Sequence, residues 1–321
     1  MILTITLNPL IERRYTYKNI ELGKHHRNGS YEIRSGGKGI NVSRQLNSLN
    51  LQNYALTFLG GQNGKTLRDE LEKEKINSGF IKTQSETRDC SIIIGENEKS
   101  ISAFFAPNST ISPNEVEEFI SKLDKMIQNS GIIVFSGSSP CRETDIIFAY
   151  GIELANKYDK ISVLDTYGEH LKNCIEKSPT ILHNNFEELQ TSLNTSLKSE
   201  NEIFSLLDWL YGKGIKQSYV TNAEKPFFAA NFDYHFKIRN PKITSVDSTG
   251  SGDSFVAGIV YSWYHNLKFE ESLSIAASLG ALNAASLEVS KVKLSEIDAV
   301  KKNVKIDTIG KKMKILDDTP R

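Results

Sequence analysis

From residue 113 onward, short apolar segments alternate with longer segments that have a helical repeat. The apolar segments 132–135 and 161–164 are too short for helices, and each is followed by polar residues. Segments 113–127 and 145–157 carry apolar residues at helical spacing. Short, largely apolar strands that alternate with helices form parallel sheets covered by helices on both faces. We therefore predict an α/β fold that binds its ligands at the carboxyl ends of the parallel strands.

Two segments in the N-terminal third, 12–34 and 89–105, do not follow this alternation. The first is polar and aromatic without a helical period, and the second has the pattern of a hairpin. We predict that they form a small second β-sheet inserted into the main domain. The main domain then comprises residues 1–11, 35–88 and 106–321.

The composition excludes several classes of partner. The chain has 39 Lys+Arg and 39 Asp+Glu residues, so no overall charge favours nucleic acid or a membrane surface. No apolar run approaches the length of a membrane span, and the first residues lack the pattern of a signal peptide. The 3 cysteines are scattered and odd in number, which is typical of a reducing compartment. We expect a cytoplasmic protein.

The segment Val246–Gly258 begins as a polar turn and continues as an apolar helix with small residues. Gly250 and Gly252 let the backbone bend sharply and approach a ligand closely. Asp253 stands where the helix begins, and the free N–H groups of a helix start form an anion site. Asp253 could simply cap the helix. Alternatively, it is a base beside a phosphate-binding turn.

Three other segments carry residues suited to phosphate or metal chemistry. Residues 36–43 form a diglycine turn with a lysine, followed by a helix. Thr221 ends a strand and precedes the polar turn 222–226. Asn185 and Glu188 are three residues apart, on one face of a first helical turn. That spacing also serves helix capping, and both functions are compatible.

These motifs resemble those of the PfkB, or ribokinase-like, carbohydrate kinases over essentially the whole chain. The N-terminal motif of that family matches residues 36–43, with Gly60 in the expected later place. The C-terminal motif matches residues 247–255 without a break, and the metal-associated N-x-x-E motif matches Asn185 and Glu188. Two long motifs in the correct order are far more specific than a lone glycine motif.

Within the family, the chain resembles the branch that phosphorylates sugars already carrying a phosphate, such as the 1-phosphofructokinases and tagatose-6-phosphate kinases. Residues 4–9 match the typical opening of that branch, and residues 136–140 match its Ser-Gly-Ser-x-Pro turn. Lys38 and Arg88 stand where the branch has cations for the substrate phosphate. Taken alone, Arg88 would be an ordinary surface arginine on an edge strand.

The resemblance implies a role for each matching residue. Asp253 would be the catalytic base, beside a turn that holds the charge developing on the γ-phosphate of ATP and that is formed by Gly250, Ser251 and Gly252. The residues implied to bind the sugar phosphate are Glu12, Gly36, Gly37, Lys38, Asn41, Arg88, Ser138 and Asp253. The residues implied to bind ATP are Asn185, Thr221, Ala223, Lys225, Gly250, Gly252 and Asn283. Mg²⁺ would be held, through water, by Asn185 and Glu188.

The family also implies a ribokinase-like fold, a three-layer α/β/α sandwich with a mostly parallel sheet and a small β-sheet lid. In the family this lid closes over the sugar and often pairs with a second subunit, so we expect a homodimer through the lid. The helix around Asn283 would cover the adenine of ATP. The small residues of that helix are equally consistent with close helix packing.

Several residues depart from the family pattern on the substrate-facing and nucleotide-facing sides. Glu12 stands in place of an aspartate that grips sugar hydroxyls, and Ala106 in place of an acidic residue. Ala223 lies in a loop that usually carries two glycines, and His183 stands where lysine is common. The sequence therefore predicts the reaction better than it predicts which ketohexose phosphate is used. Two alternatives remain: a kinase of an unphosphorylated sugar or nucleoside, and a catalytically weak sugar-phosphate sensor.

Overall fold

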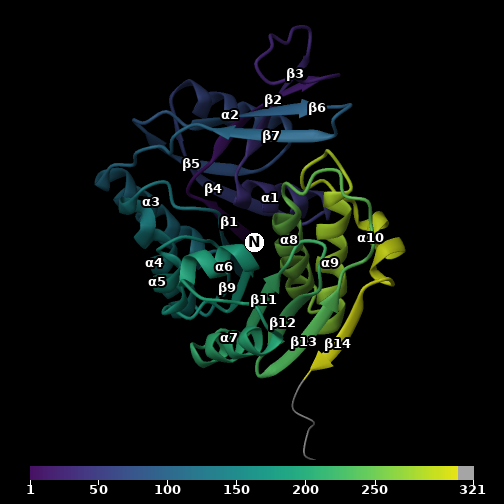
Figure 1. Cartoon of the computed structure of the whole chain (residues 1–321). Helices are drawn as coiled ribbons and strands as arrows, with labels where there is room; N and C mark the ends of the chain where they lie inside the picture. The colour runs from purple at the N-terminus through teal and green to yellow at the C-terminus, as the bar shows by residue number, and fades with distance from the viewer. Residues whose placement is uncertain (310–321) are drawn as a thin grey trace, which may run out of the picture.

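A computed structural model describes residues 1–309 of the chain, and within them one large sheet has ten strands (Figure 1). Its strands are β1 (Ile2–Thr6), β4 (Asn53–Gly60), β5 (Ser78–Thr83), β8 (Ile132–Ser136), β9 (Ile161–Asp165), β10 (Ile181–Asn185), β11 (Gln217–Thr221), β12 (Phe227–Asn231), β13 (Tyr234–Arg239) and β14 (Lys305–Ile309). Their order is β14-β13-β12-β11-β10-β9-β8-β1-β4-β5. Strands β11 to β5 in this order pair in parallel, and β12, β13 and β14 extend the sheet antiparallel.

Helices cover both faces of this sheet. They are α1 (Lys38–Ser48), α2 (Gly61–Lys73), α3 (Pro113–Gln128), α4 (Asp145–Lys157), α5 (Leu171–Ile175), α6 (Phe186–Leu193), α7 (Glu200–Gly212), α8 (Ser251–Tyr264), α9 (Phe269–Ala284) and α10 (Leu294–Lys301). A short 3₁₀ turn, Arg142–Thr144, precedes α4.

Two hydrophobic cores lie on opposite faces of the large sheet. In β8, Ile133 and Phe135 pack with residues of helices α3 to α7, whereas Ile132 and Val134 pack with residues of α1, α8 and α9. Successive side chains of a strand point to opposite faces, so an apolar strand supplies both cores. This arrangement confirms the predicted three-layer α/β/α fold with a mostly parallel sheet.

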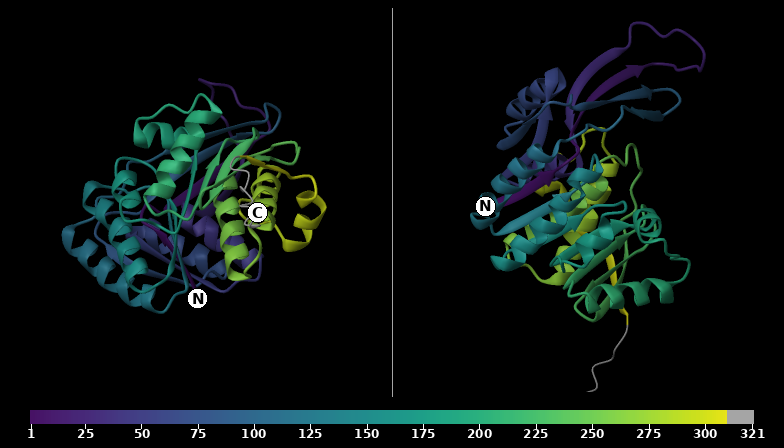
Figure 2. Two further views of the ribbon diagram at one scale, coloured as in Figure 1. Left: turned by 90° about the horizontal axis from the view of Figure 1, so that it is seen from below. Right: turned by 90° about the vertical axis from the view of Figure 1, so that its left-hand side faces the viewer.

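The small second sheet is also confirmed; it packs against one end of the large domain and projects outward from it (Figure 2). Its strands are β2 (Leu10–Tyr17), β3 (Ser30–Gly36), β6 (Arg88–Gly95) and β7 (Ser100–Phe105), in the order β3-β2-β6-β7. Strands β2 and β6 pair in parallel, and the two outer strands pair antiparallel to them. Strand β2 follows β1 of the large sheet after three residues, and β6 follows β5 after four.

The sequence did not predict β5, α5 and β14 as elements.

Helices α8 and α9 pack closely: a Cβ on Gly258 of α8 would lie only 2.7 Å from the Cα of Ala276 in α9. Small residues here therefore do serve helix packing. Among the described residues, no helix is both long enough and apolar enough to cross a membrane.

Candidate active site

The glycine turn before α8 is built as an anion site. Gly250 has a left-handed backbone (φ +76°), and a Cβ there would lie 2.5 Å from Cγ1 of Val289. The backbone N–H of Thr249 donates to Oδ1 of Asp247 at 2.9 Å, and Nδ2 of Asn283 donates to the Thr249 carbonyl at 2.7 Å. The N–H of Ser251 donates to the Ser248 carbonyl at 3.1 Å, so the turn is held from several sides. The N–H groups of Gly252 and Asp253 are the next donors of this helix start and are suited to an anion.

Asp253, in the first turn of α8, is buried beside this turn. Nδ2 of Asn41, from α1, donates to its Oδ2 at 2.7 Å, although the two residues are 212 positions apart. Burial raises the pKa of Asp253 to about 7; Lys38 and the Asn41 hydrogen bond oppose the rise, and nearby carboxylates add to it. A carboxylate with a pKa close to neutral can accept a proton and hold it.

Asp165, at the end of β9, is a second buried carboxylate with very different contacts. It accepts hydrogen bonds from Oγ of Ser136 at 2.7 Å and from Nδ1 of His183 at 2.9 Å, and it lies 3.5 Å from Nζ of Lys38. Burial alone would raise its pKa, but Lys38 and His183 outweigh it and hold the pKa of Asp165 below its usual range. Asp165 was not predicted as a site residue.

Lys38 lies among carboxylates. Its Nζ is 2.8 Å from Oε1 of Glu188, and the amino group lies over the ring of Tyr167 at 5.2 Å from the centroid. Burial opposes the charge, yet Asp165 and Glu188 outweigh burial and raise the pKa of Lys38 above its usual range. The predicted partner of Lys38 in phosphate binding, Arg88, has a different set of contacts.

Arg88 lies in a polar cluster at the start of β6. Its Nη1 donates to Oδ1 of Asn108 at 2.9 Å, and Nδ2 of Asn8 donates to the same oxygen and to Oγ of Ser138, at 3.0 Å each. Nε of Arg88 is buried without a hydrogen-bond partner, and the guanidinium lies over the ring of Phe105. Burial lowers the pKa of Arg88. Since β6 is an inner strand, Arg88 is not on an edge of the sheet.

Asn8 and Asn108 join this cluster although neither was predicted as a site residue. The available signals were that Asn8 lies in the matched opening of residues 4–9 and that Asn108 follows the predicted hairpin. The cluster offers a cation, amide groups and a hydroxyl at one place, which is the donor set that an anionic group requires.

Asn185 and Glu188 form a reciprocal capping box at the start of α6. The N–H of Glu188 donates to Oδ1 of Asn185 at 2.8 Å, and the N–H of Asn185 donates to Oε2 of Glu188 at 3.0 Å. The capping interpretation of this motif is therefore confirmed. The neighbouring Asn184 has a buried Oδ1 without a hydrogen-bond partner.

These oxygens suit Mg²⁺ held mainly by water and phosphate. In residues 1–309, no group of three or more histidine, cysteine, aspartate or glutamate side chains is arranged to hold a metal ion. Mg²⁺ retains several waters and commonly takes only one or two protein carboxylates. Of the two residues predicted to hold Mg²⁺ through water, Asn185 uses its Oδ1 in the cap, and Glu188 contacts the N–H of Asn185 and Nζ of Lys38. Both side chains can still accept from water, and the unpartnered Oδ1 of Asn184, which was not predicted, is a further oxygen suited to the ion.

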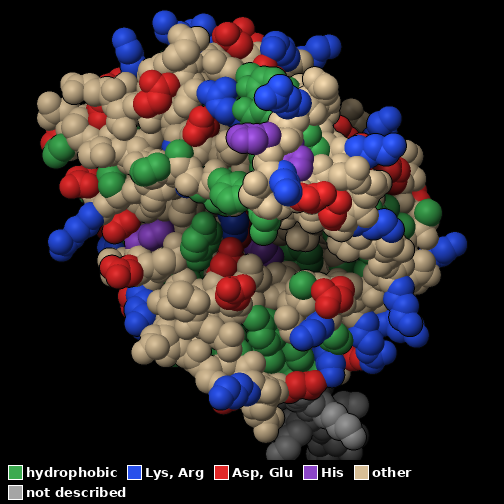
Figure 3. All heavy atoms as spheres, turned by 45° about the horizontal axis from the view of Figure 1, so that its top comes forward, with side chains coloured by type: hydrophobic (Ala, Val, Ile, Leu, Met, Phe, Trp, Pro, Cys, Tyr) green, Lys and Arg blue, Asp and Glu red, His purple; other side chains and the backbone are tan. Residues whose placement is uncertain are grey.

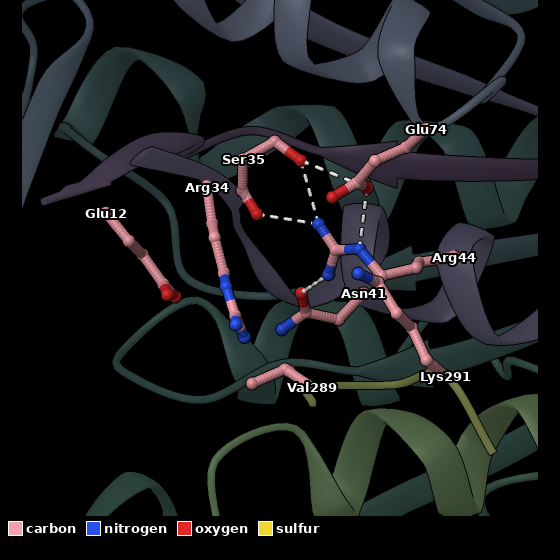
Figure 4. Close-up of a pocket in the computed structure, with 8 residues that line it drawn as sticks. All are labelled: Glu12, Arg34, Ser35, Asn41, Arg44, Glu74, Val289 and Lys291. Carbon is pink, nitrogen blue, oxygen red and sulfur yellow. Dashed lines mark hydrogen bonds and ion pairs between the residues drawn. The ribbon is translucent and has the colours of Figure 1, made fainter. Parts of the chain in front are cut away.

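A small pocket lies between β2, β3 and α1 (Figure 4). The residues that line it are Glu12, Arg34, Ser35, Asn41, Arg44, Glu74, Val289 and Lys291. Nη1 of Arg44 donates to Oδ1 of Asn41 at 2.6 Å, which directs the other end of that amide toward Asp253. A Cβ on Gly36 would lie 3.1 Å from Oε1 of Glu12, so the predicted glycine lets this carboxylate approach the backbone. Gly37, with φ +128°, completes the turn into α1.

The predicted nucleotide residues lie at the end of β11 and beyond. Oγ1 of Thr221 is 3.3 Å from Nε2 of His183, whose ring stacks on Phe255 of α8. Ala223 has a left-handed backbone (φ 48°), and Nδ2 of Asn240 donates to the carbonyls of Ala223 and Lys225. This is how the loop turns without the usual glycines.

Asn283 is buried, and both ends of its amide are used within the protein. Its Nδ2 donates to Thr249 and to Oγ of Ser251, and its Oδ1 accepts from the N–H of Ser290. Asn283 thus supports the glycine turn from behind. The molecular surface is hollowed near the centre of Figure 3, where acidic and hydrophobic side chains meet.

Comparisons with known proteins agree with this architecture. A family model described as "pfkB family carbohydrate kinase" matches residues 4–296. A tagatose-6-phosphate kinase of Staphylococcus epidermidis is 29% identical over 317 residues, which cover 95% of this chain and 99% of that protein. A solved structure from Thermotoga maritima, named "Possible 1-phosphofructokinase", has a TM-score of 0.88 at 25% identity and covers 96% of this chain and 99% of its own. The Escherichia coli phosphofructokinase-2 solved with potassium has a TM-score of 0.87 at 20% identity, covering 94% and 98%, and shows the shared fold.

Proposed function

The chain belongs to the pfkB family of carbohydrate kinases, and from this premise we propose that it transfers the γ-phosphate of ATP to a hydroxyl of a ketohexose phosphate. The acceptors that we propose are fructose 1-phosphate and tagatose 6-phosphate, which would become 1,6-bisphosphates. The observation that carries the proposal is Asp253, a buried carboxylate with a pKa raised by burial to about 7, placed at the glycine turn that starts α8. Its position suits a base beside a γ-phosphate.

In this mechanism the acceptor hydroxyl oxygen attacks the γ-phosphorus. The bond from that phosphorus to the bridging oxygen of the β-phosphate breaks, ADP leaves with the electron pair, and Asp253 takes the hydroxyl proton. The N–H groups of Gly252 and Asp253 at the start of α8 stabilise the charge that develops on the transferred group. When bound, Mg²⁺ would neutralise charge on the phosphates; Glu188 and Asn184 are the residues suited to hold it.

Lys38 would stabilise the negative charge of the transferred γ-phosphate and would also bind the sugar phosphate. Its amino group lies between Asp165 and Glu188, at 3.5 Å and 2.8 Å. A cation held by two carboxylates keeps a fixed position, which phosphoryl transfer requires more than it requires covalent chemistry. Its predicted role in binding the sugar phosphate stays part of this proposal.

The phosphate already on the sugar would bind at the Arg88 cluster. This position is supported by the unpartnered Nε of Arg88 and by the amides of Asn8 and Asn108 around it. A buried guanidinium donor without a partner is costly unless a ligand or water satisfies it. A phosphate oxygen would do so.

A coupled ADP-release assay tests the proposal. The acceptors are fructose 1-phosphate, fructose 6-phosphate, tagatose 6-phosphate, free fructose and free tagatose. We expect turnover with a ketohexose phosphate and a KM for it that rises at least tenfold in Arg88→Ala. Arg68→Ala is the control, because Arg68 is 46% exposed on α2 and its ion pairs are with Asp69 and Glu72 of the same helix.

Two results would contradict the proposal. Highest activity on a free sugar, with no effect of Arg88→Ala, would favour an unphosphorylated acceptor. Tight binding of a sugar phosphate in calorimetry without any turnover would favour a sensor.

We further propose that the protein is a cytoplasmic homodimer that pairs through the small sheet. This is supported by exposed aromatic side chains on its outer strands, Phe104 and Tyr31, which are 63% and 50% exposed. Sedimentation of the wild type and of Phe104→Asp tests the dimer, with Phe232→Asp, at an exposed position in the turn between β12 and β13, as control. A monomeric wild type would contradict it.

A further inference from the structure

Arg14 is a buried arginine on β2 whose side chain contacts two carboxylates from different parts of the molecule. Its side chain is 3% exposed. Nη1 lies 3.2 Å from Oε2 of Glu12, two residues earlier on the same strand, and Nη2 lies 3.5 Å from Oδ2 of Asp247. Burying an arginine is costly, so a buried one requires partners of this kind.

The two carboxylates belong to the two halves of the candidate site. Glu12 belongs to the small sheet and lines the pocket beside Asn41 (Figure 4). Asp247 belongs to the large domain, and its other oxygen accepts from the N–H of Thr249, the residue before Gly250. Arg14 thus joins the pocket of Figure 4 to the glycine turn before α8, through side chains that are all nearly buried.

The neighbouring arginine on the strand shows that this contact is specific. Arg13 points to the opposite face, as alternation on a strand requires, and its side chain is 29% exposed. It forms hydrogen bonds with Asp89, Tyr31 and Asn63, none of which belongs to the glycine turn. Arg13 and Arg14 are therefore a matched pair with the same chemistry and different partners.

Glu12 needs such a partner because its side chain has one more rotatable bond than an aspartate. Burial raises the pKa of Glu12 above its usual range, and Arg14 is the largest opposing influence. One oxygen is held by Arg14, while the other lies toward Gly36 and the pocket.

We propose that Arg14 is a positioning residue for the acceptor, which fixes the Glu12 carboxylate relative to the glycine turn through Asp247. The inference rests on the proposed function, because it assumes that Glu12 contacts the sugar. Misplacement of a reacting group by about 1 Å costs on the order of 100-fold in rate. Arg14 would therefore affect acceptor binding and reaction together, with little effect on ATP.

Steady-state kinetics of Arg14→Met tests this. We expect kcat/KM for the best acceptor to fall roughly 100-fold, shared between a higher KM and a lower kcat, while the KM for ATP stays within about twofold. Arg13→Met should keep the acceptor KM. A purely structural role would lower the melting temperature and the active fraction without raising the acceptor KM, and that result would overturn the proposal.

A double-mutant cycle tests the coupling to Glu12. We expect Glu12→Gln to reduce the acceptor kcat/KM strongly in the wild type and only slightly in Arg14→Met, because Glu12 is already misplaced there. Additive effects would overturn the proposal. If Arg14→Met folds poorly, Arg14→Lys is the second variant, because it keeps a cation but lacks the two-armed guanidinium that contacts both Glu12 and Asp247, and it should also raise the acceptor KM.

Acceptor binding by calorimetry separates this inference from the proposed function. A wild type that binds fructose 1-phosphate or tagatose 6-phosphate but does not turn it over contradicts the kinase proposal alone. Equal acceptor affinity in the wild type and in Arg14→Met contradicts the role of Arg14 alone. A wild type that binds none of these acceptors contradicts both.

Discussion

Two buried aspartates of the candidate site, Asp253 and Asp165, have pKa values that their surroundings shift in opposite directions. Asp253 begins α8 and has one amide donor, from Asn41. Asp165 ends β9 and has a serine, a histidine and a lysine within 3.5 Å. The exposed fractions are 4% for Asp253 and 0% for Asp165, so burial does not distinguish them.

The difference in partners separates their chemistry. Burial raises the pKa of Asp253 to about 7, whereas Lys38 and His183 hold the pKa of Asp165 below its usual range. Two carboxylates with diverging pKa values commonly have separate roles in one reaction. Asp253 is suited to accept a proton, and Asp165 is suited to remain an anion that fixes Lys38.

The largest expected effect is on turnover in Asp253→Asn. An amide keeps the size and can still accept the hydrogen bond from Asn41, but it cannot take the acceptor proton. We expect kcat to fall by roughly 10²- to 10⁴-fold in the ADP-release assay. Asp69→Asn, on the exposed face of α2, is the control. Normal turnover in Asp253→Asn would exclude it as the base.

Asp165→Asn should affect stability more than any other carboxylate substitution in the site. The change leaves Lys38 with Glu188 alone and removes the anion beside His183. Removing one partner of a buried ion pair typically costs about 3 kcal/mol or more. Urea unfolding at pH 7 measures the loss.

Adding Lys38→Met to Asp165→Asn tests the cause of that loss. Lys38→Met removes the ammonium group that Asp165→Asn leaves with only one carboxylate partner. The double variant should therefore recover part of the free energy of unfolding. An unchanged unfolding midpoint in Asp165→Asn would show that Asp165 and Asp253 do not differ in the way proposed.

The acid limb of the pH–activity profile should be set by Asp253. Its carboxylate must be deprotonated to act as a base, so kcat/KM should fall as the pH drops below about 7. The Asn41 hydrogen bond lowers the pKa of Asp253, and Asn41→Leu should therefore move the limb to higher pH. Asn47→Leu, further along α1, should leave it in place. A limb that does not move would assign the titration to another group.

The sequence predicted one of these two aspartates and missed the other. Asp253 stands in a glycine turn before an apolar helix, a pattern that is local and complete within a few residues. The contacts of Asp165 come from Ser136, His183 and Lys38, on β8, β10 and α1. The available signal was a short apolar strand that ends directly in a carboxylate, and it does not say which side chains will surround that carboxylate.

The fold followed the same rule. Alternation of apolar strands and helices predicted the layers, and the two segments that depart from it, 12–34 and 89–105, predicted the second sheet, because both signals depend on local pattern. Strand β14 was missed, since its place depends on antiparallel pairing with β13, more than 60 residues earlier. Arg14 could not be singled out either, because its partner Asp247 is separated from it by 233 positions.

The smallest expected effect is on the free energy of unfolding of Asp253→Asn. We expect this substitution to stabilise the protein above neutral pH, whereas most substitutions destabilise. The Asp253 carboxyl has a pKa near 3.9 in an unfolded chain and about 7 when folded, so the folded protein binds more protons between these values. Its contribution to stability therefore falls as the pH rises through this window.

At pH 8 the buried Asp253 carboxylate is charged, and burying that charge costs free energy that a neutral amide does not. We expect Asp253→Asn to be more stable than the wild type at pH 8, on the order of 1 kcal/mol or more, and this advantage to be clearly smaller at pH 5, where the folded carboxyl is protonated. Thermal unfolding at the two pH values measures this, with Asp69→Asn showing no such dependence; a variant that is less stable at pH 8 would mean that the Asp253 carboxylate is favourably paired, as Asp165 is.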